Sequence, residues 1–144
     1  HRMLAVNLDG TFWGCQAALP LLRDSGRGAI VNLSSVSGLK GDLELVAYDA
    51  SKAAVCQLSK EIALFCAAQN YQVRCNSVHP GIVGTAMIEQ FFATSELAQV
   101  EEWRQPDGRT IRPEEVAAMI TWLASPQASF VTGAEYVIDG GLSA

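Results

Sequence analysis

The sequence predicts an α/β fold with a doubly wound parallel sheet, and three observations predict it. Helical and strand-like patterns alternate along the 144 residues. The strand-like segments are short apolar runs, which is typical of parallel strands covered by helices on both faces. The helical patterns between them are long enough to cross over a sheet. Only three strands are predicted, so the chain corresponds to about half of such a fold.

The N-terminal segment is predicted to be one long helix over residues 3–23. Its apolar residues recur at spacings of three and four, beginning at Leu4 and Leu8. Pro20 is expected to kink the helix near its end. Residues 24–28 contain two glycines and are predicted to form a turn.

The middle of the chain predicts a strand, a loop, a helix and a second strand. Residues 29–33 form an apolar, β-branched run typical of a buried strand. A loop is expected over 36–46, and an apolar helical face over 48–68. Residues 71–78 alternate in character and predict a second strand, which His79-Pro80-Gly81 is expected to end.

The C-terminal segment predicts short helical pieces, a helix and a third strand. Residues 86–109 carry only short helical patterns. A proline followed by two glutamates starts a helix expected over 113–124. Residues 135–138 predict the last strand, ended by Asp139-Gly140-Gly141.

The composition excludes several classes of protein. Apolar residues make up 49% of the chain, which is too many for disorder. The net charge is −5, so we expect no nucleic-acid partner. No apolar run reaches the roughly eighteen residues of a membrane span, and no signal-peptide pattern opens the chain. Four cysteines without paired spacing predict free, buried thiols in a reducing compartment, here the cytoplasm: Cys15, Cys56, Cys66 and Cys75.

Tyr48 and Lys52 form the first candidate catalytic pair. They are four residues apart in a predicted helix, so both lie on one face. An ammonium about 5 Å from the phenol would contribute roughly 3.3 kcal/mol at an effective dielectric constant of about 20. That is roughly 2.4 pKa units, enough to make a tyrosine a general acid/base near neutral pH. The alternative is a surface lysine packed over an aromatic ring.

Ser35 strengthens the catalytic interpretation. It follows a predicted buried strand, at the carboxyl edge where ligands bind in open α/β sheets. Its hydroxyl could bind a substrate oxygen, but it could equally satisfy loop backbone groups. On chemistry alone, Ser34 and Ser37 compete for the same role.

A third element follows the second strand. Gly81 permits a ligand to approach the backbone closely, Ile82 and Val83 can offer backbone groups to a planar amide, and Thr85 offers a hydroxyl. The segment begins at Pro80. Alone, the segment would be taken for an ordinary turn at the end of a strand.

Five ordered blocks together resemble the signature of the short-chain dehydrogenase/reductase family, which has a Rossmann-type fold. They cover essentially the whole chain: Asn7–Phe12, Ile30–Ser35, Tyr48–Lys52, Asn76–Gly81 and Ile138–Gly141. The separation of Ser35 and Tyr48 fits the family and selects Ser35 over its neighbours. Within the family, the chain looks most like bacterial secondary-alcohol and hydroxysteroid dehydrogenases.

The resemblance implies a role for each matching residue. Tyr48 would exchange a proton with the substrate oxygen, and Lys52 would lower the pKa of Tyr48 and hold the ribose of NAD or NADP. Ser35 would orient the substrate oxygen. Asn7 would interrupt its helix and hold a water behind Lys52, although from the sequence alone it is a mid-helix asparagine. Pro80 to Thr85 would flank the nicotinamide.

The resemblance also implies a lid, an oligomer and a missing half. Residues 86–109 resemble the substrate lid, with candidate pocket residues Met87, Ile88, Phe91, Phe92 and Trp103. The family forms homodimers or homotetramers. The glycine-rich pyrophosphate-binding turn is absent from 1–144, which resembles the C-terminal portion of one domain. We therefore expect further residues before His1.

The sequence leaves more than one function open. The main hypothesis is NAD(P)-dependent hydride transfer between a secondary alcohol and its ketone. The alternatives are a truncated, non-catalytic domain that acts by association, and an isomerase or dehydratase using the same tyrosine. No metal site is predicted, because His1 and His79 have no cysteine or carboxylate cluster near them in the sequence. Trp13, Trp122 and Phe130 are expected in the core or at subunit contacts.

Overall fold

A parallel three-stranded sheet forms the centre of the chain. The computed structural model describes residues 1–41, 45–94 and 108–144. In them the strands lie in the order β1-β2-β3, with all pairs parallel: β1 (Gly28–Leu33), β2 (Val73–Pro80) and β3 (Glu135–Ile138). The predicted α/β architecture with a parallel sheet is confirmed.

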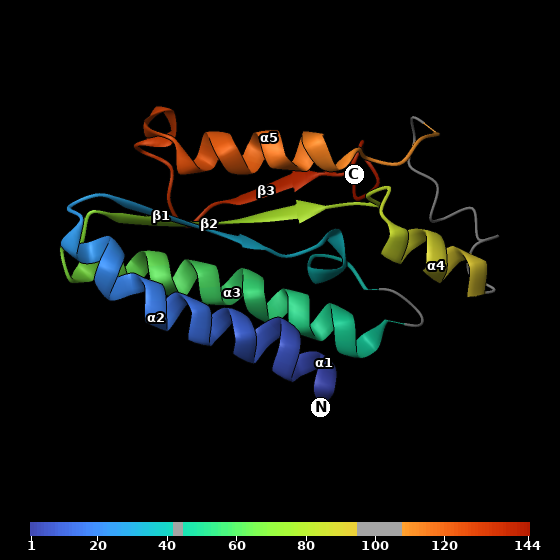
Figure 1. Ribbon diagram of the computed structural model, residues 1–144, viewed down its shortest axis with the longest axis horizontal. Coiled ribbons are helices and arrows are strands. Elements are labelled where there is room, and N and C mark those ends of the chain that lie inside the picture. Colours follow the sequence, from blue (N-terminus) through green and yellow to red (C-terminus); the bar gives the residue numbers. More distant parts are fainter. Residues whose placement is uncertain (42–44, 95–107) are drawn as a thin grey trace.

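Helices cover both faces of this sheet. Figure 1 shows α2 (Gly10–Asp24) and α3 (Val46–Ala68) on one face and α5 (Pro113–Ala124) on the other. A shorter helix, α4 (Ala86–Thr94), lies beyond the carboxyl end of β2. The layers are those of a doubly wound sheet.

The predicted N-terminal helix is interrupted. It consists of α1 (Arg2–Leu4), a π-helical turn (Ala5–Asp9) and α2. Asn7 lies inside the π-helical turn, as the family resemblance implied. Such turns break the regular hydrogen-bond ladder and free a local carbonyl group for other donors.

The structure corrects the predicted end of the second strand. His79 and Pro80 continue β2, where they pair with Val137 and Ile138 of β3. The strand persists because β3 aligns with this last part of β2, and a proline is tolerated where the ladder ends. The helix predicted at 113–124 and the strand predicted at 135–138 have the observed bounds.

Two apolar clusters hold the layers together, one on each face of the sheet. Successive side chains of β2 point alternately toward the two clusters, as the two-residue period of a strand requires. The cluster beneath α2 and α3 comprises Cys15, Ile30, Ala63, Cys66, Val73 and Cys75. The cluster beneath α5 comprises Val78, Ile111, Val116 and Leu123. All four cysteines are free and buried, as predicted.

Several large apolar side chains face outward. Trp13 is 60% exposed and Phe130 is 99% exposed, so neither lies in the core of this chain. The core placement considered for them is wrong, and contact with another subunit stays a prediction. Among the described helices, none is long and apolar enough to cross a membrane.

Candidate active site

The candidate catalytic residues meet at the carboxyl end of the sheet. Ser35 lies two residues beyond the end of β1, and Tyr48 and Lys52 lie in the first two turns of α3. The Ser35 side chain lies close enough to the Tyr48 phenol to lower its pKa. The Lys52 Nζ lies 5.6 Å from the centre of the Tyr48 ring. The fold therefore brings together the three groups that the sequence singled out.

The electrostatics of Tyr48 differ from the sequence-based estimate. Burial raises the pKa of Tyr48 above its usual value near 10, and this outweighs the lowering effect of the Ser35 hydrogen bond. The neighbouring Asp49 charge also raises it. The prediction that Lys52 would bring about a net lowering of the Tyr48 pKa is wrong for this chain, because it considered only the charge of Lys52 and not the cost of burying the phenolate.

Lys52 is held at the end of β1. Its Nζ donates to the carbonyl oxygen of Leu33 at 3.0 Å. Burial lowers the pKa of Lys52. The backbone carbonyl of Lys52 accepts a hydrogen bond from Ser34 Oγ at 2.8 Å, which ties α3 to the strand end.

Ser35 is fixed from two sides. Its Oγ accepts a hydrogen bond from the backbone N–H of Ser37 at 3.2 Å, so it caps a short 3₁₀ turn (Val36–Gly38). Its carbonyl oxygen lies 3.1 Å from His79 Nδ1. Ser34 instead bonds the backbone of α3, which explains why Ser35 is the serine that faces Tyr48.

Asn7 reaches the same helix from the other side. Its Nδ2 donates to Ser51 Oγ at 3.0 Å, and Ser51 Oγ donates to the carbonyl oxygen of Tyr48 at 2.6 Å. Thr11 Oγ1 donates to the carbonyl oxygen of Asn7 at 2.7 Å. The π-helical turn is thus linked to the catalytic turn of α3 through one buried serine.

The segment after β2 packs against residues 110–111. Ile111 N–H donates to the Ile82 carbonyl, and Gly84 N–H donates to the Ile111 carbonyl, both at 2.8 Å. This parallel bridge leaves the N–H and C=O of Val83 on the opposite side. The sequence offered both Ile82 and Val83 as backbone partners for a planar amide, but the Ile82 carbonyl is engaged here.

Gly81 and Thr85 have local roles in the same segment. A Cβ on Gly81 would lie 3.0 Å from that of Asp139, so the close approach predicted for this glycine is to the turn after β3. Thr85 Oγ1 accepts from the N–H of Ile88 at 3.4 Å, near the start of α4.

The candidate lid is only partly described. Met87 is 77% exposed on α4, and Ile88, Phe91 and Phe92 are half-buried. Trp103 and the rest of 95–107 lie outside the described residues.

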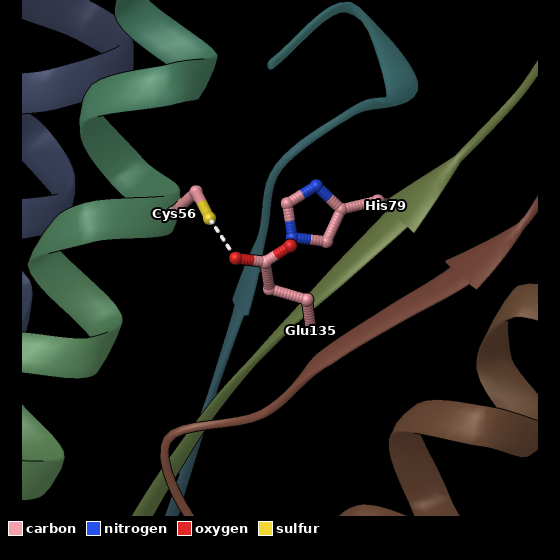
Figure 2. A group of neighbouring side chains, drawn as sticks. All are labelled: Cys56, His79 and Glu135. Carbon is pink, nitrogen blue, oxygen red and sulfur yellow. Dashed lines mark hydrogen bonds between the residues drawn. The ribbon is translucent and has the colours of Figure 1, made fainter. Parts of the chain in front are cut away.

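His79 lies next to a cysteine and a carboxylate that the sequence did not predict as its neighbours. Figure 2 shows it beside Cys56 and Glu135, whose candidate ligand atoms lie within 4.8 Å of one another. The expectation that His79 lacks a nearby cysteine or carboxylate is wrong, because α3 and β3 bring both to β2. The ring is fully buried, with Ser77 Oγ 2.8 Å from Nε2.

Sequence reasoning did not assign positioning roles to three residues: Ser34, which it considered only as a rival of Ser35, Ser51, and His79. Each lies inside a block that carried the family resemblance, next to or near an expected catalytic residue. The signal available in the sequence was a polar residue at a position predicted to be buried, because a buried polar group requires a hydrogen-bond partner.

Comparisons with known proteins find several similar chains. A protein-family model described as enoyl-(acyl carrier protein) reductase matches residues 1–143. The chain is 41% identical to an NADP-dependent (R)-specific alcohol dehydrogenase of Lentilactobacillus kefiri, over 100% of this chain and 57% of that protein. It is 39% identical to a 3-alpha-(or 20-beta)-hydroxysteroid dehydrogenase of Mycobacterium tuberculosis, over 98% of this chain and 51% of that protein.

A solved structure is also similar. It is a 4-hydroxyisoleucine dehydrogenase mutant complexed with NADH and succinate, with a TM-score of 0.85 and 34% identity. The similarity covers 97% of this chain and 57% of that one. The chain thus spans about half the length of the relatives it matches.

Proposed function

The chain belongs to the short-chain dehydrogenase/reductase family, and on that premise we propose that it carries the catalytic part of an NAD(P)-dependent oxidoreductase. The proposed reaction transfers hydride between a secondary alcohol and its ketone. The observation that carries the proposal is the meeting of Ser35, Tyr48 and Lys52 at the carboxyl end of the sheet, where the Ser35 side chain lowers the Tyr48 pKa and Lys52 Nζ lies 5.6 Å from the phenol ring. The dehydrogenase names of the relatives support it.

Tyr48 moves the proton. In the reduction direction its hydroxyl donates to the developing alkoxide, and in the oxidation direction the phenolate accepts the proton of the alcohol. The raised pKa keeps Tyr48 protonated at neutral pH, which suits the role of acid. Ser35 donates a hydrogen bond to the same substrate oxygen and stabilises its developing charge.

Lys52 supplies positive charge beside the phenol. Its ammonium favours the phenolate when Tyr48 loses its proton. The contact with Leu33 fixes its position at the strand end. Asn7 and Ser51 hold the backbone of the same helical turn, and we propose that a water held by Asn7 completes a proton path behind Lys52.

The residues present fit the nicotinamide half of NAD or NADP. The Tyr48 hydroxyl and the Lys52 ammonium are suited to sugar hydroxyls. The backbone N–H and C=O of Val83, which point away from the bridge to Ile111, offer one donor and one acceptor, as a carboxamide requires. When bound, the nicotinamide supplies or accepts the hydride. The Thr85 hydroxyl is a further polar group in this segment, whose residues Pro80 to Thr85 would flank the ring.

We propose a small, largely apolar alcohol or ketone as substrate and a homodimer or homotetramer as the assembly. The apolar side chains of α4 support the first proposal, with residues 86–109 as the lid. The exposed apolar side chains on α2 and α3 support the second.

Replacing Tyr48 by phenylalanine tests the proposed role. The variant keeps the ring but loses the proton that is exchanged, and general acid/base groups contribute about 10²–10⁴-fold to rates. We expect turnover of secondary alcohols to fall by at least about 100-fold, while NAD(P)H binding measured by fluorescence is retained.

Ser37→Ala is the matched control, because the Ser37 side chain was a competing candidate, whereas the contact of Ser37 with Ser35 is made by its backbone N–H, which donates to Ser35 Oγ and is kept in the variant. This variant should keep most of its activity. Undiminished turnover in Tyr48→Phe would rule out the assigned proton donor.

A further inference from the structure

Cys56, His79 and Glu135 form a mixed cluster outside the proposed proton path. They come from α3, β2 and β3, and Figure 2 shows the three side chains converging. Cys56 Sγ donates to Glu135 Oε1 at 3.2 Å. Cys56 and His79 are buried, whereas the side chain of Glu135 is 30% exposed and gives access from solvent.

The ring of His79 is already oriented as in a metal-ligating histidine. Its Nδ1 faces the carbonyl oxygen of Ser35, which can only accept, so Nδ1 carries the proton. Nε2 therefore presents a lone pair, which accepts from Ser77 Oγ. Metal-bound histidines characteristically donate their second ring N–H to a carbonyl or carboxylate in this way.

The spacing of the ligand atoms suits a small divalent cation. Zinc bonds of about 2.0–2.3 Å place tetrahedral ligand atoms roughly 3.3–3.8 Å apart. The 3.2 Å between Cys56 Sγ and Glu135 Oε1 is close to the lower end of this range, and the three ligand atoms all lie within 4.8 Å of one another. Bringing every pair of ligand atoms into this range requires a shift of about 1 Å at most, and the Glu135 side chain is 30% exposed, which gives it room to move.

Lys60 now neutralises the carboxylate. Its ammonium forms an ion pair with Glu135, and its side chain is 39% exposed. A cation bound to Glu135 would displace this ammonium into solvent. Lys60 is therefore a competitor for the site, and its removal should strengthen metal binding.

We propose that Cys56, His79 and Glu135 bind a thiophilic divalent cation of the Zn²⁺ class. Binding forms bonds to Cys56 Sγ, His79 Nε2 and a Glu135 oxygen. It breaks the hydrogen bond from Ser77 Oγ to His79 Nε2 and releases the Cys56 thiol proton to solvent. A thiolate, an imidazole and a carboxylate together favour zinc over magnesium or calcium, which prefer oxygen ligands alone. The site lies next to the proposed redox centre, since His79 Nδ1 is 3.1 Å from the Ser35 carbonyl oxygen, but none of its three ligands has a role in the proposed proton path.

Titration of the intact protein with Co²⁺ and Zn²⁺ tests the proposal. Co²⁺ should produce a thiolate-to-cobalt charge-transfer absorption, and Zn²⁺ should abolish it. Cys56→Ser should eliminate this absorption and weaken Zn²⁺ binding at least about tenfold by equilibrium dialysis. Lys60→Met, a change at a partly exposed position, should lower the zinc dissociation constant severalfold.

Two matched variants identify where the metal binds. Cys66→Ser changes another buried thiol, and His1→Ala removes the other histidine of the sequence. Both should retain the absorption and the zinc affinity. A wild-type protein without the absorption, or a Cys56→Ser variant that folds and keeps it, overturns the proposal. If Cys56→Ser does not fold, unchanged zinc affinity in Lys60→Met overturns it instead.

Discussion

At the scale of single residues, burial has the largest effect on the catalytic group. A four-residue spacing indicated that Lys52 would lie near Tyr48, and it does. The spacing could not indicate how much protein would surround the phenol, and this desolvation sets the direction of its pKa. The sequence was therefore enough to predict which side chains are catalytic candidates. The direction of the Tyr48 pKa shift could be found only from the packed structure.

The raised pKa of Tyr48 predicts opposite pH dependences for the two reaction directions. Ketone reduction needs the protonated phenol, which persists through neutral pH. Alcohol oxidation needs the phenolate, whose population grows as the pH rises toward the raised pKa. We expect the oxidation kcat to increase from about pH 7 to about pH 10, measured with saturating substrates. An oxidation rate that falls over this range would contradict the assignment of Tyr48 as the base.

Cys75 predicts a loss of stability in alkali. Burial, as the largest effect, raises the pKa of this thiol to about 12, against 9.0 when it is exposed. Its contribution is intact below about pH 9 and is lost progressively as the pH rises to about 12, because the unfolded chain binds fewer protons there. The three-unit difference corresponds to on the order of 4 kcal/mol at most.

Urea unfolding at several alkaline pH values measures this effect. Cys75→Ala should lower stability at neutral pH by opening a cavity, but its stability should fall less steeply above about pH 9. Parallel profiles for the variant and the wild type would show that Cys75 is not responsible.

At the scale of elements, the short 3₁₀ turn after β1 depends on Gly38. A Cβ at this position would lie 2.8 Å from the Lys52 carbonyl carbon and 2.9 Å from the Ala53 nitrogen. Since both neighbours are backbone atoms of α3, neither can rotate away. The glycine thus allows the turn that carries Ser35 to pack directly on the helix that carries Lys52.

Gly38→Ala should therefore push these two elements apart. We expect a loss of about 1–3 kcal/mol in unfolding free energy, as for other overpacked sites, and a lower kcat. Gly14→Ala is the control, because a Cβ there meets nothing within 4 Å in α2. The control should be neutral or more stable by up to about 1 kcal/mol. Equal stabilities for the two variants in chemical denaturation would disprove the tight contact.

Elements with strong local signals were predictable, and those set by neighbours were not. Pro113 and two glutamates defined the start of α5, and Glu115 does accept the Arg112 N–H there. The end of β2 depends on β3, which lies more than fifty residues further along the chain. The placement of Cys56 and Glu135 beside His79 likewise depends on the sheet order, which no local pattern encodes.

At the scale of the whole molecule, apolar side chains remain on the outer helices. Leu21 of α2 is 74% exposed and Leu64 of α3 is 66% exposed, in addition to Trp13. Such side chains are costly to leave in water when they gather on one surface. The composition showed that the chain is rich in apolar residues. Only the structure shows which of these residues stay exposed in the folded chain.

We expect the intact protein to be a dimer or tetramer in sedimentation equilibrium. Trp13→Glu, at an exposed position, should weaken this assembly without unfolding the chain. Gln16→Glu on the same helix adds the same charge at an exposed polar position and should leave the assembly unchanged. A wild-type protein that is monomeric at all concentrations would contradict the expectation.

The most direct test of the proposed reaction is to follow the transferred hydrogen itself. The intact protein would be incubated with NAD or NADP and a secondary alcohol deuterated at the carbinol carbon, and the nicotinamide would be analysed by mass spectrometry. We expect deuterium on the reduced cofactor with the wild type and almost none with Tyr48→Phe. Equal transfer by both proteins, or none by a wild type that binds both ligands, would contradict it.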